Sequence, residues 1–194
     1  MKAHSSERSL AELIEGNARF AAGASVHPRQ DPERRAVVAR GQHPRAAIVA
    51  CSDSRVPPEL VFDQGLGDLF VVRTAGNIID DLGVASLEYA AVHLGVPLVV
   101  VMGHSRCSAV TAAVEGVEAP GRFSAIHEAL APAVEKTKDR PGDAVDAAAR
   151  ENVKSSVTML ESAEGVLKDR IDRGALLVVG AFYDIERGSV EFIR

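Results

Sequence analysis

Hydrophobic residues along this chain fall into short unbroken runs that are separated by longer segments with helical spacing. The runs predict strands over residues 46–50, 69–72, 98–102 and 176–180. Short apolar runs bounded by polar residues and glycine are typical of strands buried on both faces of a parallel sheet. Because helical segments alternate with these strands, the pattern predicts an α/β fold: a central parallel β-sheet of about four strands flanked by helices.

Helical segments are expected on both sides of the third strand. Before it, Leu82, Leu87 and Ala90 recur at helical spacing until Gly95 and Pro97 stop the helix. After it, residues 144–171 carry apolar side chains at the same spacing and predict a pair of helices that returns the chain to the last strand.

The first forty residues are amphipathic although no strand precedes them. Leu10, Leu13, Ile14 and Phe20 predict short helices with one apolar face. Such helices need a surface to pack on. The length of 194 residues fits one domain, since a chain of this size commonly forms one core.

Composition argues against several classes of protein. The net charge is −5 and the basic residues are scattered, so nucleic acid is not an expected partner. No apolar run approaches the roughly 18 residues that a membrane span requires, so no membrane partner is expected. The start of the chain has no apolar stretch of the kind found in secretory signals, and we therefore expect a cytoplasmic, reducing environment.

The two cysteines of the chain each lie in a polar cluster that follows a predicted strand. Cys51 opens the run CSDSR, and Cys107 ends the run HSRC, three residues after His104. In open α/β sheets, ligands bind at the carboxyl edge of the strands. Thiolate and imidazole groups suit zinc, and three such ligands leave a fourth position for water, substrate or a carboxylate. The alternatives are a disulfide, which a reducing compartment disfavours, and ordinary buried cysteines.

Two motifs carry a resemblance to a known family. Residues 51–57 (CSDSRVP) and 103–107 (GHSRC) resemble the two signatures of the β-class carbonic anhydrases, and the similarity continues in family order through residues 13–20, 62–77 and 178–184. The resemblance implies reversible hydration of carbon dioxide to bicarbonate and a proton by zinc-bound hydroxide. It makes Cys51, His104 and Cys107 the ligands of a Zn²⁺ ion.

The resemblance also implies an assembly and a division of the chain. It makes residues 1–42 a helical dimerisation arm that packs on a partner subunit, and residues 43–194 a zinc-binding α/β core. The expected state is a homodimer or a homotetramer.

Asp53 and Arg55 follow the first ligand and have two interpretations within the family. In one, Arg55 holds Asp53, which accepts a hydrogen bond from the zinc-bound hydroxide and orients it toward substrate. In the other, Asp53 turns away from Arg55 and becomes the fourth zinc ligand in a closed, inactive site. An ordinary partly exposed ion pair, worth about 0 to 1 kcal/mol, is the third alternative.

Three further residues match substrate-binding positions of the family. Gln42 matches a side chain that reaches across the dimer to substrate or bicarbonate, and Phe70 matches an apolar wall of the carbon dioxide pocket. Ser108 stands where the family usually has glycine, at the start of a predicted helix whose backbone N–H favours negative charge. Arg73 and Asn77, in the loop after the second strand, are candidates for a supporting or purely structural role.

Two rival functions remain open at this point. Carbonyl sulfide and carbon disulfide are linear apolar molecules that the same zinc site can attack, so a hydrolase of either is one alternative. A non-catalytic zinc or bicarbonate sensor is the other, favoured if Asp53 closes the site or if Ser108 blocks substrate.

Overall fold

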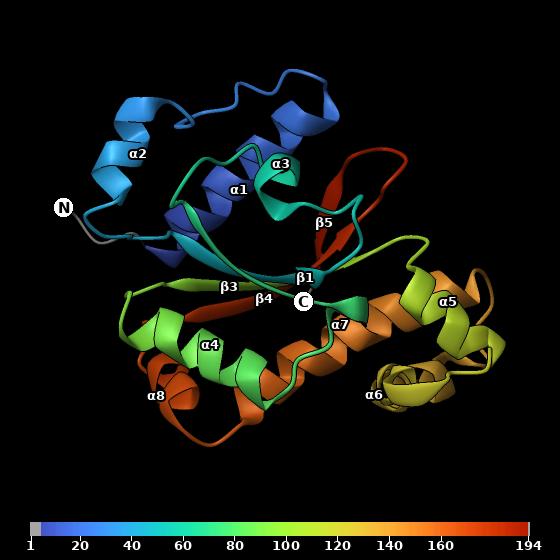
Figure 1. Cartoon of the computed structure of the whole chain (residues 1–194). Helices are drawn as coiled ribbons and strands as arrows, with labels where there is room; N and C mark the ends of the chain where they lie inside the picture. The colour runs from blue at the N-terminus through green and yellow to red at the C-terminus, as the bar shows by residue number, and fades with distance from the viewer. Residues whose placement is uncertain (1–4, 194) are drawn as a thin grey trace.

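The computed structural model describes residues 5–193, and Figure 1 shows the arrangement of its helices and strands. In chain order the elements are α1 (Ser6–Ala21), α2 (Pro32–Val38), β1 (Ala46–Cys51), α3 (Pro58–Val61), β2 (Leu69–Thr74), the 3₁₀ turn η1 (Ala75–Asn77), α4 (Asp81–Val92), β3 (Leu98–His104), α5 (Ser108–Glu115), the 3₁₀ turn η2 (Gly121–Phe123), α6 (Ser124–Thr137), α7 (Ala144–Ser162), α8 (Val166–Asp172), β4 (Leu177–Tyr183) and β5 (Val190–Ile193). The predicted α/β class is confirmed. Within the described residues, no helix is long and apolar enough to cross a membrane.

The sheet has five strands in the order β2-β1-β3-β4-β5. The four predicted strands are all present and pair in parallel, whereas β5 is a fifth strand that pairs antiparallel with β4. The sheet therefore has one strand more than the four that the sequence predicted. The fourth strand also continues to Tyr183, beyond its predicted end at residue 180.

Helices cover both faces of the sheet (Figure 1). On one face, Ile48, Val100 and Met102 pack with Leu13 of α1 and Val61 of α3. The opposite face is covered by α4, α7 and α8, which contribute side chains such as Leu87, Val153, Leu160 and Leu167. Every residue of β1 and β3 is buried, which explains their uninterrupted apolar sequences.

Helix α1 is held by its own chain. The Nδ2 group of Asn17 donates to the carbonyl oxygens of Val61 and Gly188, and its Oδ1 accepts from the backbone N–H of Val190. Arg19 adds an ion pair of 2.6 Å with the buried carboxylate of Asp63. By contrast, α2 has no buried residue, and Val37 on it is 62% exposed. The surface that α1 was expected to need is thus provided in part by the core of the same chain.

Parallel pairing brings the polar clusters to one edge of the sheet. Cys51 is the last residue of β1 and lies opposite Thr74 of β2, while His104 is the last residue of β3 and lies opposite Tyr183 of β4. Because β1 and β3 are neighbours and point in the same direction, their carboxyl ends lie side by side.

Candidate metal centre

Three metal-binding side chains meet at the carboxyl edge of the sheet. Cys51 ends β1, His104 ends β3, and Cys107 is the N-cap residue of α5. One ligand atom from each of the three lies within 4.8 Å of the other two, and all three residues are buried. The convergence predicted from the two polar clusters is confirmed.

The hydrogen bonding of His104 selects one ring nitrogen for a metal. Its Nδ1 lies 2.9 Å from the carbonyl oxygen of Ser105, which can only accept, so Nδ1 carries the proton. Its Nε2 is buried and has no hydrogen-bond partner among the described residues. A buried acceptor without a donor is costly, and a metal ion at Nε2 satisfies it in the way typical of histidine ligands.

The two sulfur atoms also fit zinc. The Sγ atoms of Cys51 and Cys107 lie 3.9 Å apart, and both cysteines are free rather than joined in a disulfide. In a tetrahedral site with zinc–sulfur bonds of about 2.3 Å, two sulfurs are separated by about 3.8 Å. The donor atoms therefore fit the Cys₂His ligand set of a catalytic zinc ion.

The surroundings of Cys51 favour its thiolate. Contact with the Cys107 thiol lowers the pKa of Cys51 most, burial opposes that effect, and His104 lowers the pKa further, to about 4. Backbone N–H groups of Asp53 and Gly76 add hydrogen bonds to the sulfur, at 3.4 and 3.2 Å. The same contact with Cys51, together with burial, raises the pKa of Cys107. Two thiolates at this separation need a positive counter-charge, which a divalent cation supplies.

Asp53 is held beside the metal ligands by Arg55. Arg55 donates from Nε to Oδ1 at 2.9 Å and from Nη2 to Oδ2 at 2.7 Å, and its backbone N–H also donates to Oδ1. These hydrogen bonds outweigh partial burial and lower the pKa of Asp53 to about 2, so it is ionised at neutral pH. The group of converging ligand atoms contains the two cysteines and the histidine and does not contain Asp53.

Arg73 braces the backbone that carries this pair. Its guanidinium donates two hydrogen bonds to the carbonyl oxygen of Cys51, at 2.9 and 2.8 Å, and one to that of Asp53, at 2.7 Å. The sequence suggested a supporting role for Arg73 and Asn77. The contacts of Arg73 show that it supports the backbone of Cys51 and Asp53. Gly76, which donates to the Cys51 sulfur, has no side chain and was missed, although it sits in the motif RTAGN.

The remaining predicted residues lie in different places. Ser108 is the first residue of α5, directly after Cys107, and is exposed. Gln42 is exposed in the segment before β1, at the opposite end of that strand from Cys51. Phe70 lies opposite Ala47, four residues before Thr74, and its half-buried ring lies tilted beside that of Tyr89, with 6.4 Å between centroids. At about 3.3 Å per residue, this places Phe70 about 13 Å along the sheet from the metal ligands of its own chain.

Comparison with known proteins assigns the family. A family model described as carbonic anhydrase matches residues 46–190, which include all three ligand positions. The chain is 43% identical over 180 residues to carbonic anhydrase 2 of Mycobacterium tuberculosis, covering 91% of this chain and 87% of that protein. It is 40% identical over 183 residues to a carbonic anhydrase of Mycolicibacterium smegmatis, covering 92% and 89%.

Solved structures agree with this assignment. The β-carbonic anhydrase CcaA superposes with a TM-score of 0.75 at 30% identity, covering 95% of each chain. Tetrameric β-carbonic anhydrases of Sordaria macrospora superpose with a TM-score of 0.78 at 25% identity, covering 95% of this chain and 96% of that chain. The chain belongs to the β-class carbonic anhydrase family, and its Cys51, His104 and Cys107 group fits the zinc site of that family.

Proposed function

We propose that this chain catalyses the reversible hydration of carbon dioxide to bicarbonate and a proton, with Cys51, His104 and Cys107 holding Zn²⁺. The observation that carries this proposal is the convergence of these ligand atoms beside the Asp53–Arg55 pair. When bound, zinc acidifies a coordinated water so that a nucleophile for the carbon of carbon dioxide exists near neutral pH. The chain's own residues hold the ion, orient the nucleophile and bind the product.

Asp53 is proposed to orient the nucleophile. An ionised carboxylate can only accept hydrogen bonds, so Asp53 accepts one from the attacking oxygen and directs a lone pair of that oxygen toward substrate. Arg55 donates a hydrogen bond to each carboxylate oxygen of Asp53, and these bonds keep Asp53 away from the metal position. The arrangement corresponds to the open site, and loss of the Arg55 contacts is the step that lets Asp53 close it as a fourth ligand.

Ser108 is proposed to bind bicarbonate through its backbone N–H. It lies at the first position of α5, where backbone N–H groups without helical partners attract anions. Its side chain is exposed and lies beside Cys107. The hydroxymethyl group adds a side chain where the family usually has glycine, and it leaves the N–H in place.

Gln42 and Phe70 are proposed to serve the site of a partner subunit. Both lie far along the sheet from the ligands of their own chain, so a second copy is the way in which they reach a zinc ion. Residues 1–42 are proposed as the dimerisation arm, consistent with the exposed α2, and residues 43–194 as the zinc-binding core. Tetramers are described for the Sordaria macrospora relatives, and a homodimer or a homotetramer is proposed here. A cytoplasmic location is proposed because a reducing compartment disfavours a disulfide between the two free cysteines, Cys51 and Cys107.

Hybrid dimers test whether Gln42 acts across the interface. Cys107→Ala removes zinc from its own chain. In the proposal, Gln42→Ala removes the amide that contacts the site of the partner subunit. If Gln42 acts across the interface, mixing the two weak variants restores about one working site per hybrid dimer. If Gln42 acts within its own chain or not at all, mixing restores nothing beyond the average of the two variants.

Substrate comparison tests the reaction itself. Purified protein with a measured zinc content is assayed for carbon dioxide hydration and for sulfide release from carbonyl sulfide. Carbon dioxide hydration that is faster than sulfide release supports the anhydrase. Sulfide release without hydration would establish the hydrolase, and one zinc per chain with neither activity would establish a sensor.

A further inference from the structure

Helix α7 packs beside the metal centre through Ala148 and Ala149, and it reaches the centre by hydrogen bonding through the buried side chain of Asn152. Asn152 is 7% exposed, and its Nδ2 donates to the carbonyl oxygen of Gly76 at 3.0 Å. The N–H of that same residue, Gly76, donates to the sulfur of Cys51 at 3.2 Å. A continuous path of two hydrogen bonds therefore joins α7 to a zinc ligand.

Gly76 is conformationally flexible, so the direction of its N–H depends on the groups that hold its backbone. Gly76 has φ of 68°, in the left-handed region, and it interrupts the regular geometry of η1. A glycine in this conformation can turn its peptide groups readily, because no side chain restricts it. The amide of Asn152 holds the carbonyl on one side of Gly76, and this keeps the N–H on the other side directed at the sulfur.

The position of Asn152 is set by close packing of α7 against the sheet. A Cβ atom at Gly103 would lie 2.7 Å from Cγ2 of Val153, and one at Gly180 would lie 2.9 Å from its Cγ1. The two glycines therefore let the helix approach β3 and β4 directly. Gly103 precedes the ligand His104, so the same helix also rests on the strand that carries the second ligand.

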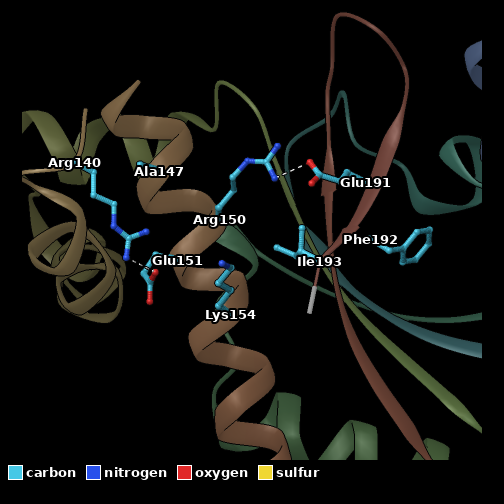
Figure 2. Close-up of a pocket in the computed structure, with 8 residues that line it drawn as sticks. All are labelled: Arg140, Ala147, Arg150, Glu151, Lys154, Glu191, Phe192 and Ile193. Atoms are coloured by element: carbon cyan, nitrogen blue, oxygen red, sulfur yellow. Dashed lines mark hydrogen bonds and ion pairs between the residues drawn. The ribbon is translucent and has the colours of Figure 1, made fainter. Parts of the chain in front are cut away.

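The residue before Asn152 has a different environment. Figure 2 shows Arg150 of α7 pointing toward Glu191 and Glu151 of α7 paired with Arg140, all four among the residues that line a surface groove. Glu151 accepts from Arg140 at 3.1 Å and also pairs with Lys136, so this ion-pair cluster joins α7 to α6 on the groove side. Asn152 alone of these α7 residues contacts the backbone that serves the metal ligands.

We propose that Asn152 is a positioning residue for the zinc site: by holding the Gly76 carbonyl, it fixes the conformation of Gly76, keeps the Gly76 N–H directed at the Cys51 sulfur and thereby sets zinc affinity. Groups that hydrogen-bond to metal ligands influence how tightly the metal binds. Removing such a group typically lowers metal affinity by about 10- to 100-fold. The inference rests on the zinc site of the proposed function.

The test replaces Asn152 by leucine, which has the same number and branching of side-chain heavy atoms but cannot donate. Asn17→Leu is the matched control, because Asn17 is also buried and also donates from Nδ2 to backbone carbonyls, at Val61 and Gly188, away from the metal ligands. Zinc affinity is measured by competition with a chromogenic chelator. The thiolate-to-metal charge-transfer band is measured after cobalt is substituted for zinc.

Asn152→Leu is expected to bind zinc about 10-fold more weakly, with the cobalt band moved to longer wavelength because the sulfur has lost a hydrogen-bond donor. Asn17→Leu is expected to unfold more easily while its affinity and band match the unsubstituted protein. Unchanged affinity and band in Asn152→Leu would overturn the proposal, as would equal changes in both variants.

A second variant and the parent protein keep the result interpretable. If Asn152→Leu does not fold, Asn152→Ala removes the donor without adding bulk, and the same affinity loss and band shift are expected. If the unsubstituted protein itself fails to bind one zinc per chain, the zinc site fails. If it binds zinc and the variants match it, only the role of Asn152 fails.

Discussion

Arg55 joins the two loops that carry the metal ligands by holding Asp53 and the backbone of Arg106 at the same time. Its Nε and Nη2 donate to the two carboxylate oxygens of Asp53, and Nη2 also donates to the carbonyl of Arg106 at 3.1 Å. Asp53 follows the ligand Cys51, and Arg106 lies between the ligands His104 and Cys107. The orientation of Asp53 is therefore coupled to the geometry of both ligand loops.

Replacing Asp53 by alanine should separate zinc binding from catalysis. The three ligand residues remain, so Asp53→Ala should keep one zinc per chain. Turnover should fall about 10²-fold, the scale of loss expected when a reacting group is no longer held in position. Zinc content and stopped-flow hydration on the same sample measure both effects.

Glu186→Ala is the control for Asp53→Ala. Glu186 pairs with Arg106 close to the site, but both side chains are about 70% exposed, so its loss should leave zinc and turnover unchanged. Equal losses of turnover in the two variants would remove Asp53 from the mechanism.

Replacing Cys107 by alanine should remove zinc and activity together. Only Cys51 and His104 remain as ligands in this variant, and a catalytic zinc site generally needs three from the protein. Metal analysis after dialysis against a weak chelator measures the loss. Full zinc occupancy in Cys107→Ala would show that the ligand assignment is wrong.

Arg73 should affect turnover through the backbone that it braces. Arg73→Met removes three hydrogen bonds to the carbonyls of Cys51 and Asp53, and it should lower turnover while costing about 1 kcal/mol of stability. Arg73→Lys keeps the charge but presents a single ammonium group in place of a planar fork, so it should recover only part of the activity. Hydration kinetics alongside urea unfolding test this, and full activity in Arg73→Met would contradict it.

Asp63 should make stability depend on pH in the acid range. Burial opposes its ionisation, but Arg19 and the backbone N–H groups of Val26 and His27 outweigh burial and lower its pKa below the ordinary value. A carboxylate with a lowered pKa in the folded state stabilises the protein above its unfolded pKa. That stability is lost as pH falls through the folded pKa.

Asp63→Asn should lose charge-assisted hydrogen bonds, at a cost of about 2 kcal/mol of stability at neutral pH, and should flatten the corresponding part of the acid dependence. Urea unfolding at a series of pH values measures it. Asp172→Asn, which breaks an exposed pair with Lys168, is the control and should cost about 0.5 kcal/mol or less. If Asp63→Asn kept the acid dependence of the unsubstituted protein, the assignment to Asp63 would be wrong.

The strand ends and the metal ligands could be predicted because they follow local patterns. Buried parallel strands are apolar throughout, so the polar residues that end β1 and β3 stand out in the sequence. The neighbouring carboxyl ends of parallel strands then bring Cys51 to His104 and Cys107.

Other features depend on contacts that no local pattern reveals. The fifth strand has four residues, and it forms because β4 offers an edge to pair with. The attachment of α1 to its own core depends on Asn17, whose partners Val61 and Gly188 lie 44 and 171 residues away. Gly76 contacts Cys51 and Asn152 through its backbone N–H and carbonyl, and such groups have no signature in the sequence.

We propose above all that Cys51, His104 and Cys107 form a working zinc site for carbon dioxide hydration, and that Arg55 keeps this site open by holding Asp53 away from the metal. The most direct test is stopped-flow hydration from mildly acidic to mildly alkaline pH, on protein whose zinc content is measured in the same sample. We predict one zinc per chain and activity that rises with pH. One zinc per chain without hydration at any pH in this range would contradict the account.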